Sequence, residues 1–261
     1  MKIKQYQVDA FASSVFSGNP AAVCILDEWL GDKTLQAIAA ENNLSETAFL
    51  VKNDTCFDLR WFTPMVEVAL CGHATLASAF VLYNCQGWVK PTVRFQTRRS
   101  GELVVSRSNG LYDMDFPARP AHCIDPPAGL LEALGVKDGD VYGSEEDLMV
   151  VLDSETRVRQ LTPDMGMLEK VECRGVIVTA KGDRSDFVSR FFAPWVGIPE
   201  DPVTGSAHCV LIPYWACVLN KKDLFARQVS KRGGEVYGRD NIDRVYISGK
   251  AALYSEGVLF V

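Results

Sequence analysis

Two related stretches of the chain decide its fold. Residues 58–76 read DLRWFTPMVEVALCGHATL, and residues 186–206 read DFVSRFFAPWVGIPEDPVTGS. Setting Trp61 against Phe191 also pairs Phe62 with Phe192, Pro64 with Pro194 and Val66 with Val196. Each copy is a strand pattern ending in an aromatic pair, then a proline-bearing loop, then a glycine-containing turn into an apolar run. The copies lie about half a chain apart, too far for a solenoid repeat. They predict two similar domains from a duplication, with a chance likeness of two strand–loop–helix units as the alternative.

The apolar runs that follow the two turns predict buried helices. They are His73–Leu82, HATLASAFVL, and Ser206–Leu219, SAHCVLIPYWACVL. Neither has a polar stripe, and a helix that is apolar on every side must be surrounded by protein. We therefore expect buried helices at residues 73–82 and 206–216. Because a proline inside a helix costs about 3 kcal/mol, we expect the second helix to kink or end at Pro213.

Short alternating segments predict strands around these helices. Cys56–Phe62, Val171–Thr179 and Arg244–Ser248 have the period of half-buried strands. The expected fold class is α+β, with two similar domains that each curl a sheet or barrel around one central buried helix. A surface helix is also expected, capped by Asp32 or Thr34. The residues of its apolar face are Leu35, Ile38 and Ala39.

A proline-rich segment marks the expected boundary between the domains. Pro117–Pro127 reads PARPAHCIDPP and holds four of the twelve prolines. We therefore expect an N-terminal domain at 1–116, a linker at 117–127 and a C-terminal domain at 128–261. The final C-terminal strand is a candidate to join the first domain instead.

Composition excludes several classes of protein. Hydrophobic residues make up 48% and charged residues 23% of the 261 residues, as in a globular chain of one large or two medium domains. The formal net charge of −6 disfavours a nucleic-acid binder or a protein that docks on anionic lipid. No export signal and no apolar span of membrane length is present. The eight cysteines form no C-x-x-C pair, so we expect reduced thiols and a cytoplasmic protein.

No cofactor or metal is expected from the sequence. The three histidines do not cluster with the cysteines, which disfavours a zinc site. No G-x-G-x-x-G dinucleotide loop and no Walker lysine motif occurs.

Glu46 is the first candidate for chemistry. It lies in Asn43–Phe49, NLSETAF, between Leu44 and Phe49. A carboxylate in apolar surroundings loses hydration, which raises its pKa toward the range of proton transfer. The alternative is an exposed glutamate on an alternating strand.

Two helix starts are the other candidate sites. In Leu70–Thr75, LCGHAT, Gly72 and His73 open the first buried helix, where free N–H groups favour an anion. His73 is either a proton carrier or a satisfied histidine in a capping turn. In Glu200–Ser206, EDPVTGS, a similar start carries a nearby carboxylate; its residues are Asp201, Thr204, Gly205 and Ser206. The alternative there is an ordinary N-cap.

Five collinear segments resemble the phenazine-biosynthesis F-like (PhzF-like) family of the diaminopimelate epimerase superfamily. They are Val8–Val23, Leu44–Phe49, Leu59–Ala77, Arg190–Trp215 and Arg227–Gly234. The resemblance implies two epimerase-like domains related by a pseudo-twofold axis, with the active site between them. It implies acid/base roles for Glu46, His73 and Asp201.

The resemblance also implies the substrate-binding groups and the assembly. The backbone at Gly72 and Gly205 would hold a substrate carboxylate, with Thr204 and Ser206 at the same helix start. A homodimer is expected from the resemblance and from the frequency of two-fold pairing. The expected partner is a small carboxylate-bearing metabolite.

One departure separates the chain from the epimerases that use two facing cysteines. Cys71 occupies the first position, but the second falls at Asp201 or Pro202, so a two-thiol racemisation is disfavoured. The leading hypothesis is a cofactor-independent isomerase with Glu46 as general acid/base. The alternatives are an epimerase or racemase that uses Glu46 with Cys71, and a non-catalytic metabolite-binding or stress-related protein.

Overall fold

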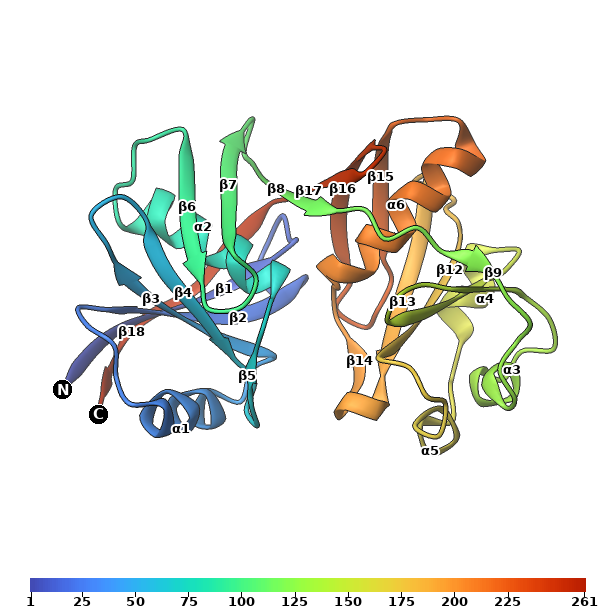
Figure 1. Cartoon of the computed structure of the whole chain (residues 1–261), viewed down its shortest axis with the longest axis horizontal. Coiled ribbons are helices and arrows are strands. Elements are labelled where there is room, and N and C mark those ends of the chain that lie inside the picture. The colour runs from blue at the N-terminus through green and yellow to red at the C-terminus, as the bar shows by residue number, and fades with distance from the viewer. The chain divides into compact units, whose positions relative to one another are not determined.

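The chain divides into two compact units in the computed structural model, which describes residues 1–261. Unit 1 comprises Met1–Asp115 and Ser248–Val261, and unit 2 comprises Phe116–Ile247. Unit 1 therefore takes its strands from both ends of the sequence, blue to green and red in Figure 1. Unit 2 is continuous in sequence and starts at the beginning of the proline-rich segment.

Unit 1 is a sheet curled around one helix. Its strands are β1 (Lys2–Ala10), β2 (Asn19–Leu26), β3 (Glu46–Lys52), β4 (Phe57–Phe62), β5 (Glu67–Val68), β6 (Thr92–Thr97), β7 (Glu102–Ser108), most of β8 (Leu111–Pro117) and β18 (Ala251–Phe260). Its helices are α1 (Asp32–Asn42) and α2 (Gly72–Cys85). The strands pair in the order β18–β1–β2–β3–β4–β6–β7–β8, with β5 paired to the end of β4.

Helix α2 is the central element of unit 1, as predicted. It packs against β1, β2, β3 and β18, and its buried residues occupy every side of the helix. Two hydroxyl side chains are buried in this helix. Neither leaves its donor unpaired, because each donates a hydrogen bond to the backbone carbonyl one helical turn earlier. Thr75 Oγ1 donates to the Cys71 carbonyl at 2.6 Å, and Ser78 Oγ donates to the Ala74 carbonyl at 2.7 Å.

Unit 2 repeats this plan around helix α6. Its strands are β9 (His122–Cys123), β10 (Asp140–Gly143), β11 (Asp147–Val151), β12 (Gly175–Lys181), β13 (Phe187–Ala193), β14 (Ile198–Asp201), β15 (Asp223–Gln228), β16 (Gly234–Asn241) and most of β17 (Arg244–Gly249). Its helices are α3 (Leu130–Leu134), α4 (Glu155–Gln160), α5 (Met165–Leu168), the 3₁₀ turn η1 (Pro194–Val196) and α6 (Gly205–Leu219). The all-round burial of α6 confirms the second predicted helix.

The strand pairings confirm that the two domains are similar, as the sequence predicts. In unit 1, β2 runs parallel to β3, β3 antiparallel to β4, and β4 parallel to β6 across α2. In unit 2, β11 runs parallel to β12, β12 antiparallel to β13, and β13 parallel to β15 across α6. The two quoted stretches therefore occupy corresponding places in two domains with the same order and direction of strands.

Helix α6 continues through Pro213 to Leu219, so the expectation that it ends at this proline is wrong. Pro213 cannot donate to the Cys209 carbonyl one turn back. That carbonyl instead accepts the backbone N–H of Arg119 at 2.9 Å, from the segment that precedes β9. Pro213 thus removes one backbone hydrogen bond from α6, and the N–H of Arg119, outside the helix, replaces it.

Two local expectations differ in detail from the structure. Helix α1 buries the predicted apolar face, but its N-cap is Gly31 without a side-chain cap, and Asp32 instead pairs with Arg60 at 2.8 Å. The strand predicted at Val171–Thr179 begins only at Gly175, after a turn.

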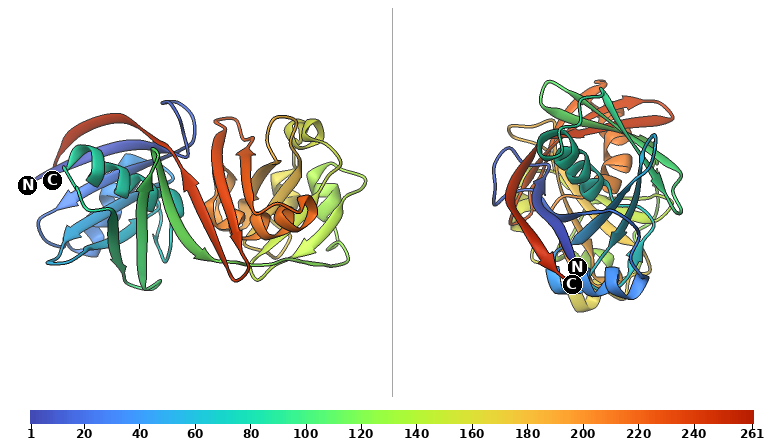
Figure 2. Two further views of the ribbon diagram at one scale, coloured as in Figure 1. Left: turned by 90° about the horizontal axis from the view of Figure 1, so that it is seen from above. Right: turned by 90° about the vertical axis from the view of Figure 1, so that its left-hand side faces the viewer.

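The first and last strands of the chain pair in unit 1. Strands β1 and β18 are antiparallel from Lys2 opposite Phe260 to Ala10 opposite Ala251, with one irregularity at Gln7/Val8. The two termini therefore lie side by side, as Figure 2 shows. None of the helices has the length and apolar character needed to cross a bilayer.

Candidate active site

Glu46 is a largely covered side chain at the start of β3. The strand pairs in parallel with β2, where Glu46 lies opposite Ala21, and in antiparallel with β4. The residues that follow, Thr47 to Leu50, are fully buried, and the Glu46 side chain is only 13% exposed. The alternative of an exposed glutamate on an alternating strand is therefore wrong.

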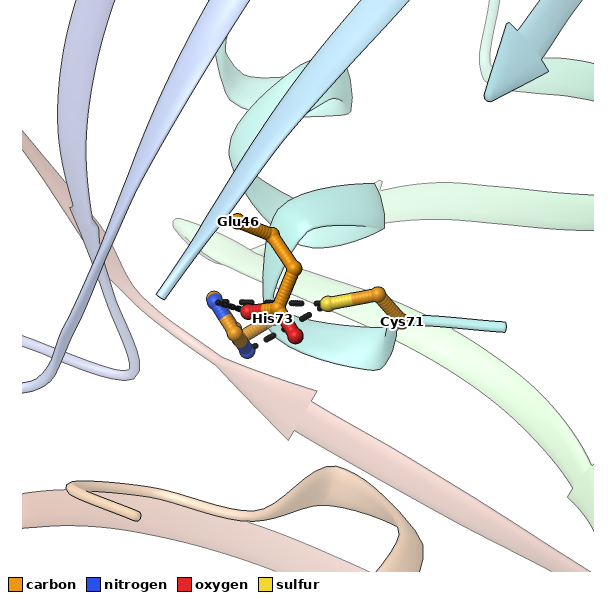
Figure 3. A group of neighbouring side chains, drawn as sticks. All are labelled: Glu46, Cys71 and His73. Atoms are coloured by element: carbon orange, nitrogen blue, oxygen red, sulfur yellow. Dashed lines mark hydrogen bonds and ion pairs between the residues drawn. The ribbon is translucent and has the colours of Figure 1, made fainter. Parts of the chain in front are cut away.

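The side chain of Glu46 meets two residues at the start of α2. Glu46 Oε2 lies 3.1 Å from His73 Nε2, and Cys71 Sγ lies 3.5 Å from His73 Nδ1. Figure 3 shows the three side chains pointing toward one another from β3 and from the turn into α2. We call them the Glu46–Cys71–His73 cluster. Cys71 and His73 are buried, so the charges of the cluster act on one another with little screening.

Asn19 orients the imidazole of His73. Its side-chain nitrogen lies 3.2 Å from His73 Nδ1, and because an amide N–H₂ only donates, Nδ1 is the acceptor. In the neutral ring the proton then lies on Nε2 and faces Glu46. The contact with Glu46 Oε2 is close but poorly directed as a hydrogen bond, so this oxygen keeps a lone pair for an incoming proton.

The pKa values of His73 and of the Cys71 thiol are both shifted upward. Burial opposes the imidazolium, but the ionised forms of Cys71 and Glu46 would stabilise it, and the pKa of His73 is raised well above its usual value. Burial, together with the charge of Glu46, raises the pKa of the Cys71 thiol to about 11. Cys71 is therefore a thiol at neutral pH.

The start of α2 presents backbone donors next to this cluster. Cys71 is the N-cap, and no side chain caps the first turn. The first N–H groups of a helix have no partner within it and favour negative charge. Gly72 is the first of them, so the helix start that was predicted to bind an anion lies next to Glu46 and His73.

The predicted residues of unit 2 gather at the start of α6. Asp201 ends β14, and Thr204 is the N-cap of α6, where its Oγ1 donates to Asp201 Oδ2 at 2.5 Å. Gln228 of β15 fixes the loop between them: its Nε2 donates to the Asp201 carbonyl at 2.8 Å, and its Oε1 accepts the Thr204 N–H at 2.9 Å. Sequence reasoning missed this buried glutamine, which follows the quoted Arg227 directly.

Ser206, at the second position of α6, is held by a partly buried ion pair. Arg174 Nη1 donates to Ser206 Oγ at 3.0 Å, and Arg174 Nε donates to Asp147 Oδ1 at 2.8 Å. Burial raises the pKa of Asp147, although Arg174 acts against the rise. Since the guanidinium occupies an acceptor site of the hydroxyl, the Ser206 O–H is left to donate. A donating hydroxyl and a cation at a helix start suit an anionic group.

The cluster corrects one expectation about metals. The sequence interpretation separated the histidines from the cysteines, but the ligand atoms of Glu46, Cys71 and His73 all lie within 4.8 Å of one another. Cys71 and His73 are two residues apart in the sequence, and this spacing was the available signal. Their third neighbour, Glu46, comes from another strand and depends on the pairing of β2, β3 and β4.

The structure thus brings the predicted residues together in two groups. Unit 1 holds Glu46, Gly72 and His73 with Cys71. The group in unit 2 lies at the end of β14 and the start of α6, and comprises Asp201, Thr204, Gly205 and Ser206. The expected shared cleft and pseudo-twofold relation of the two domains stay predictions.

Comparison with known proteins places the chain among relatives of the same length. The sequence profile of the family described as phenazine biosynthesis-like protein matches residues 8–257. A protein of Pseudomonas aeruginosa named as an uncharacterized isomerase is 55% identical over 260 residues and covers 99% of each chain. The crystal structure of a PhzF family protein from Enterococcus faecalis covers 100% of each chain, with a TM-score of 0.97 and 47% identity.

A distant structure supports the fold assignment. A hydroxyproline epimerase from Agrobacterium vitis shares the fold with a TM-score of 0.62 at 10% identity, over 99% of this chain and 92% of its own. The two-domain α+β architecture is therefore that of the epimerase-like fold. With a match that spans nearly the whole chain, this protein belongs to the phenazine biosynthesis-like (PhzF-like) family.

Proposed function

We propose that this protein is a cofactor-independent isomerase that moves a proton on a small carboxylate-bearing substrate. In this proposal Glu46 is the general acid/base. The observation that carries the proposal is the covered Glu46 carboxylate, 3.1 Å from His73 Nε2, beside the start of α2 that no side chain caps. The isomerase name of a relative 55% identical supports the reaction class.

In the first step of the proposed mechanism, Glu46 takes a proton from a substrate carbon next to an activating group. The electron pair of the broken C–H bond delocalises into the substrate, which then carries a negative charge. Donors at a helix start stabilise such charge where it develops. His73, whose Nε2–H faces the carboxylate, fixes the orientation of Glu46.

In the second step, Glu46 returns the proton to a different carbon. The substrate regains its original charge and Glu46 its carboxylate, so nothing is oxidised or reduced and no co-reactant is required. A carboxyl group that both takes and gives the proton contributes about 10²- to 10⁴-fold to the rate.

Unit 2 supplies the proposed anchor for the substrate. The start of α6 offers backbone N–H groups at Gly205 and Ser206, and the Ser206 hydroxyl is set to donate by Arg174. A substrate carboxylate satisfies these donors. Asp201 accepts from Thr204 and is the carboxylate that we assign a second proton-handling or positioning role.

An epimerase that uses Glu46 with Cys71 is the second candidate. The thiol lies in the cluster, 3.5 Å from His73 Nδ1, and as a protonated group it can give a proton. Its pKa of about 11 makes it an acid and a poor base at neutral pH. The third candidate is a metabolite-binding protein with little turnover.

A single experiment separates the three candidates. The native protein is incubated in D₂O with a library of small carboxylates, and each product is analysed by mass spectrometry and NMR. Deuterium at a new carbon with a shifted double bond supports isomerisation. Deuterium at one inverted centre supports epimerisation, and tight binding without any exchange contradicts both.

Two properties of the whole protein complete the proposal. We expect a homodimer, and light scattering at micromolar concentration that gives the monomer mass would contradict it. We also expect the protein in the cytoplasm, which fractionation of cells that produce it would test.

A further inference from the structure

The Glu46–Cys71–His73 cluster has the donor atoms of a zinc site. It offers a sulfur, an imidazole nitrogen and a carboxylate oxygen within 4.8 Å of one another. Zn²⁺ binds all three ligand types, whereas Mg²⁺ and Ca²⁺ prefer oxygen alone. The combination of a thiol with an imidazole therefore selects a borderline or soft cation.

The distances in the cluster fit tetrahedral coordination. With Zn–N near 2.0 Å and Zn–S near 2.3 Å, tetrahedral geometry separates nitrogen from sulfur by about 3.6 Å and nitrogen from oxygen by about 3.3 Å. His73 Nε2 lies 4.0 Å from Cys71 Sγ and 3.1 Å from Glu46 Oε2. Both separations are within about half an ångström of the tetrahedral value. Because Cys71 Sγ lies nearer His73 Nδ1, at 3.5 Å, a rotation of the Cys71 or His73 side chain is needed to bring the sulfur to the Nε2 side.

Charge and access also suit a divalent cation. Zn²⁺ displaces the proton of Cys71 to solvent, so the thiolate and the Glu46 carboxylate together balance its two positive charges. The cost of burying an ion is lowest when the charges of the ion and its ligands cancel. This matters here because Cys71 and His73 are buried. The partly exposed Glu46 leaves a route of entry and a fourth position for water.

Asn19 can support the histidine in its metal-bound form. When Nε2 binds the ion, the ring proton moves to Nδ1, which then donates. Asn19 is 3.2 Å from Nδ1, and a half-turn of its amide brings the oxygen to accept that proton. Ligating histidines generally have such a partner on their second nitrogen.

The geometry points to a Zn²⁺ site formed by Glu46 Oε2, Cys71 Sγ and His73 Nε2, at which zinc reversibly inhibits the protein. The inhibition rests on the proposed function, because the ion occupies the oxygen that would take the substrate proton. The binding of the ion does not rest on it. Zinc is here a regulator that competes with catalysis, and not a resident cofactor.

Metal binding is tested with zinc alone on the full chain, after treatment with a chelator. A chromogenic chelator competes for the ion and yields stoichiometry and affinity. We expect one tight Zn²⁺ per chain, and at least about 10²-fold weaker binding in Cys71→Ser and in Glu46→Gln, since even partners outside the coordination sphere change affinity 10- to 100-fold. The exposed Cys123 provides the matched control: Cys123→Ser keeps the native affinity.

Co²⁺ gives a second readout that does not depend on affinity. The native protein and Cys123→Ser should develop a thiolate-to-cobalt charge-transfer band, and Cys71→Ser should not. Circular dichroism establishes that each variant is folded. Equal zinc affinity in native and Cys71→Ser protein, or no stoichiometric binding by the native protein, overturns the site.

The inhibitory role is tested by deuterium exchange with any carboxylate that the native protein turns over. One equivalent of zinc should abolish exchange, and EDTA should restore it. Exchange that persists or increases with zinc bound overturns the inhibition. Tight zinc binding that needs Cys71, in a protein that exchanges no carboxylate, would instead support the site and contradict the proposed function.

Discussion

Replacing Glu46 by glutamine separates the shape of this side chain from its basicity. The glutamine amide occupies the same volume, and its oxygen can accept the Nε2–H of His73 that now faces the carboxylate at 3.1 Å. We expect the variant to fold and still to bind a carboxylate, because the helix starts do that binding.

The expected loss of rate follows from the lost proton-transfer group. General acid/base catalysis contributes about 10²- to 10⁴-fold, which corresponds to about 3 to 5 kcal/mol of transition-state stabilisation. The effect on stability is much smaller. The amide oxygen can still accept from His73 Nε2, and a hydrogen bond of this kind contributes about 1 kcal/mol to the free energy of unfolding.

The assay follows solvent deuterium into the product under single-turnover conditions. The native protein should incorporate deuterium, and Glu46→Gln should not do so on the same time scale. Glu67 offers a matched control, since its side chain is 18% exposed against 13% for Glu46 and it pairs with Arg60 outside the site. Glu67→Gln should lower stability and leave exchange unchanged.

One result would refute the reasoning about Glu46. If Glu46→Gln exchanges deuterium at the native rate, Glu46 is a structural carboxylate. Asp201 or His73 would then be the better candidate for the base.

Three further predictions concern unit 2. Arg174→Gln should raise KM for a carboxylate substrate about 10-fold or more with little change in kcat, because the guanidinium orients the Ser206 hydroxyl; Arg174→Lys should recover part of the loss in steady-state kinetics. Burial lowers the pKa of His208 to about 4 against 6.5 unfolded, so its contribution to stability is complete above pH 6.5 and is lost as pH falls toward 4, by roughly 3 kcal/mol; urea titrations should show this slope in the native protein and not in His208→Gln. Gly175→Ala should destabilise by about 1–3 kcal/mol, because an added Cβ would lie 2.2 Å from the Phe191 ring, and an unchanged thermal midpoint would contradict this.

The fold was largely predictable because its strongest signal is local. Helices without a polar face must be central, and α2 and α6 follow from that rule. The path of α6 past Pro213 was not predictable, because the carbonyl that loses its partner is satisfied by Arg119, far away in sequence. The helix propensity of proline takes no account of a hydrogen-bond donor such as the Arg119 N–H, which only the tertiary structure brings near.

The candidate site was predictable only as separate loci. Glu46 and His73 were identified one by one, but their contact depends on the register of β3 and on the start of α2. Arg174 and Asp147 were missed, since each is an ordinary charged residue in its own segment and acquires a role only by pairing beside Ser206. Sequence patterns name the chemistry of a residue, whereas strand pairing decides its neighbours.

The pairing of β1 with β18 sets an order of events on the ribosome. Unit 2, residues 116–247, is complete once a contiguous stretch has emerged, while β1 waits for β18, which is translated after unit 2. At about 5–20 residues per second, the interval between the two strands lasts roughly 10–50 s. During it the nascent N-terminal strand lacks its edge partner and is open to aberrant pairing or to chaperones. Unit 2 should therefore acquire protease resistance on stalled chains before unit 1, although its sequence is translated later.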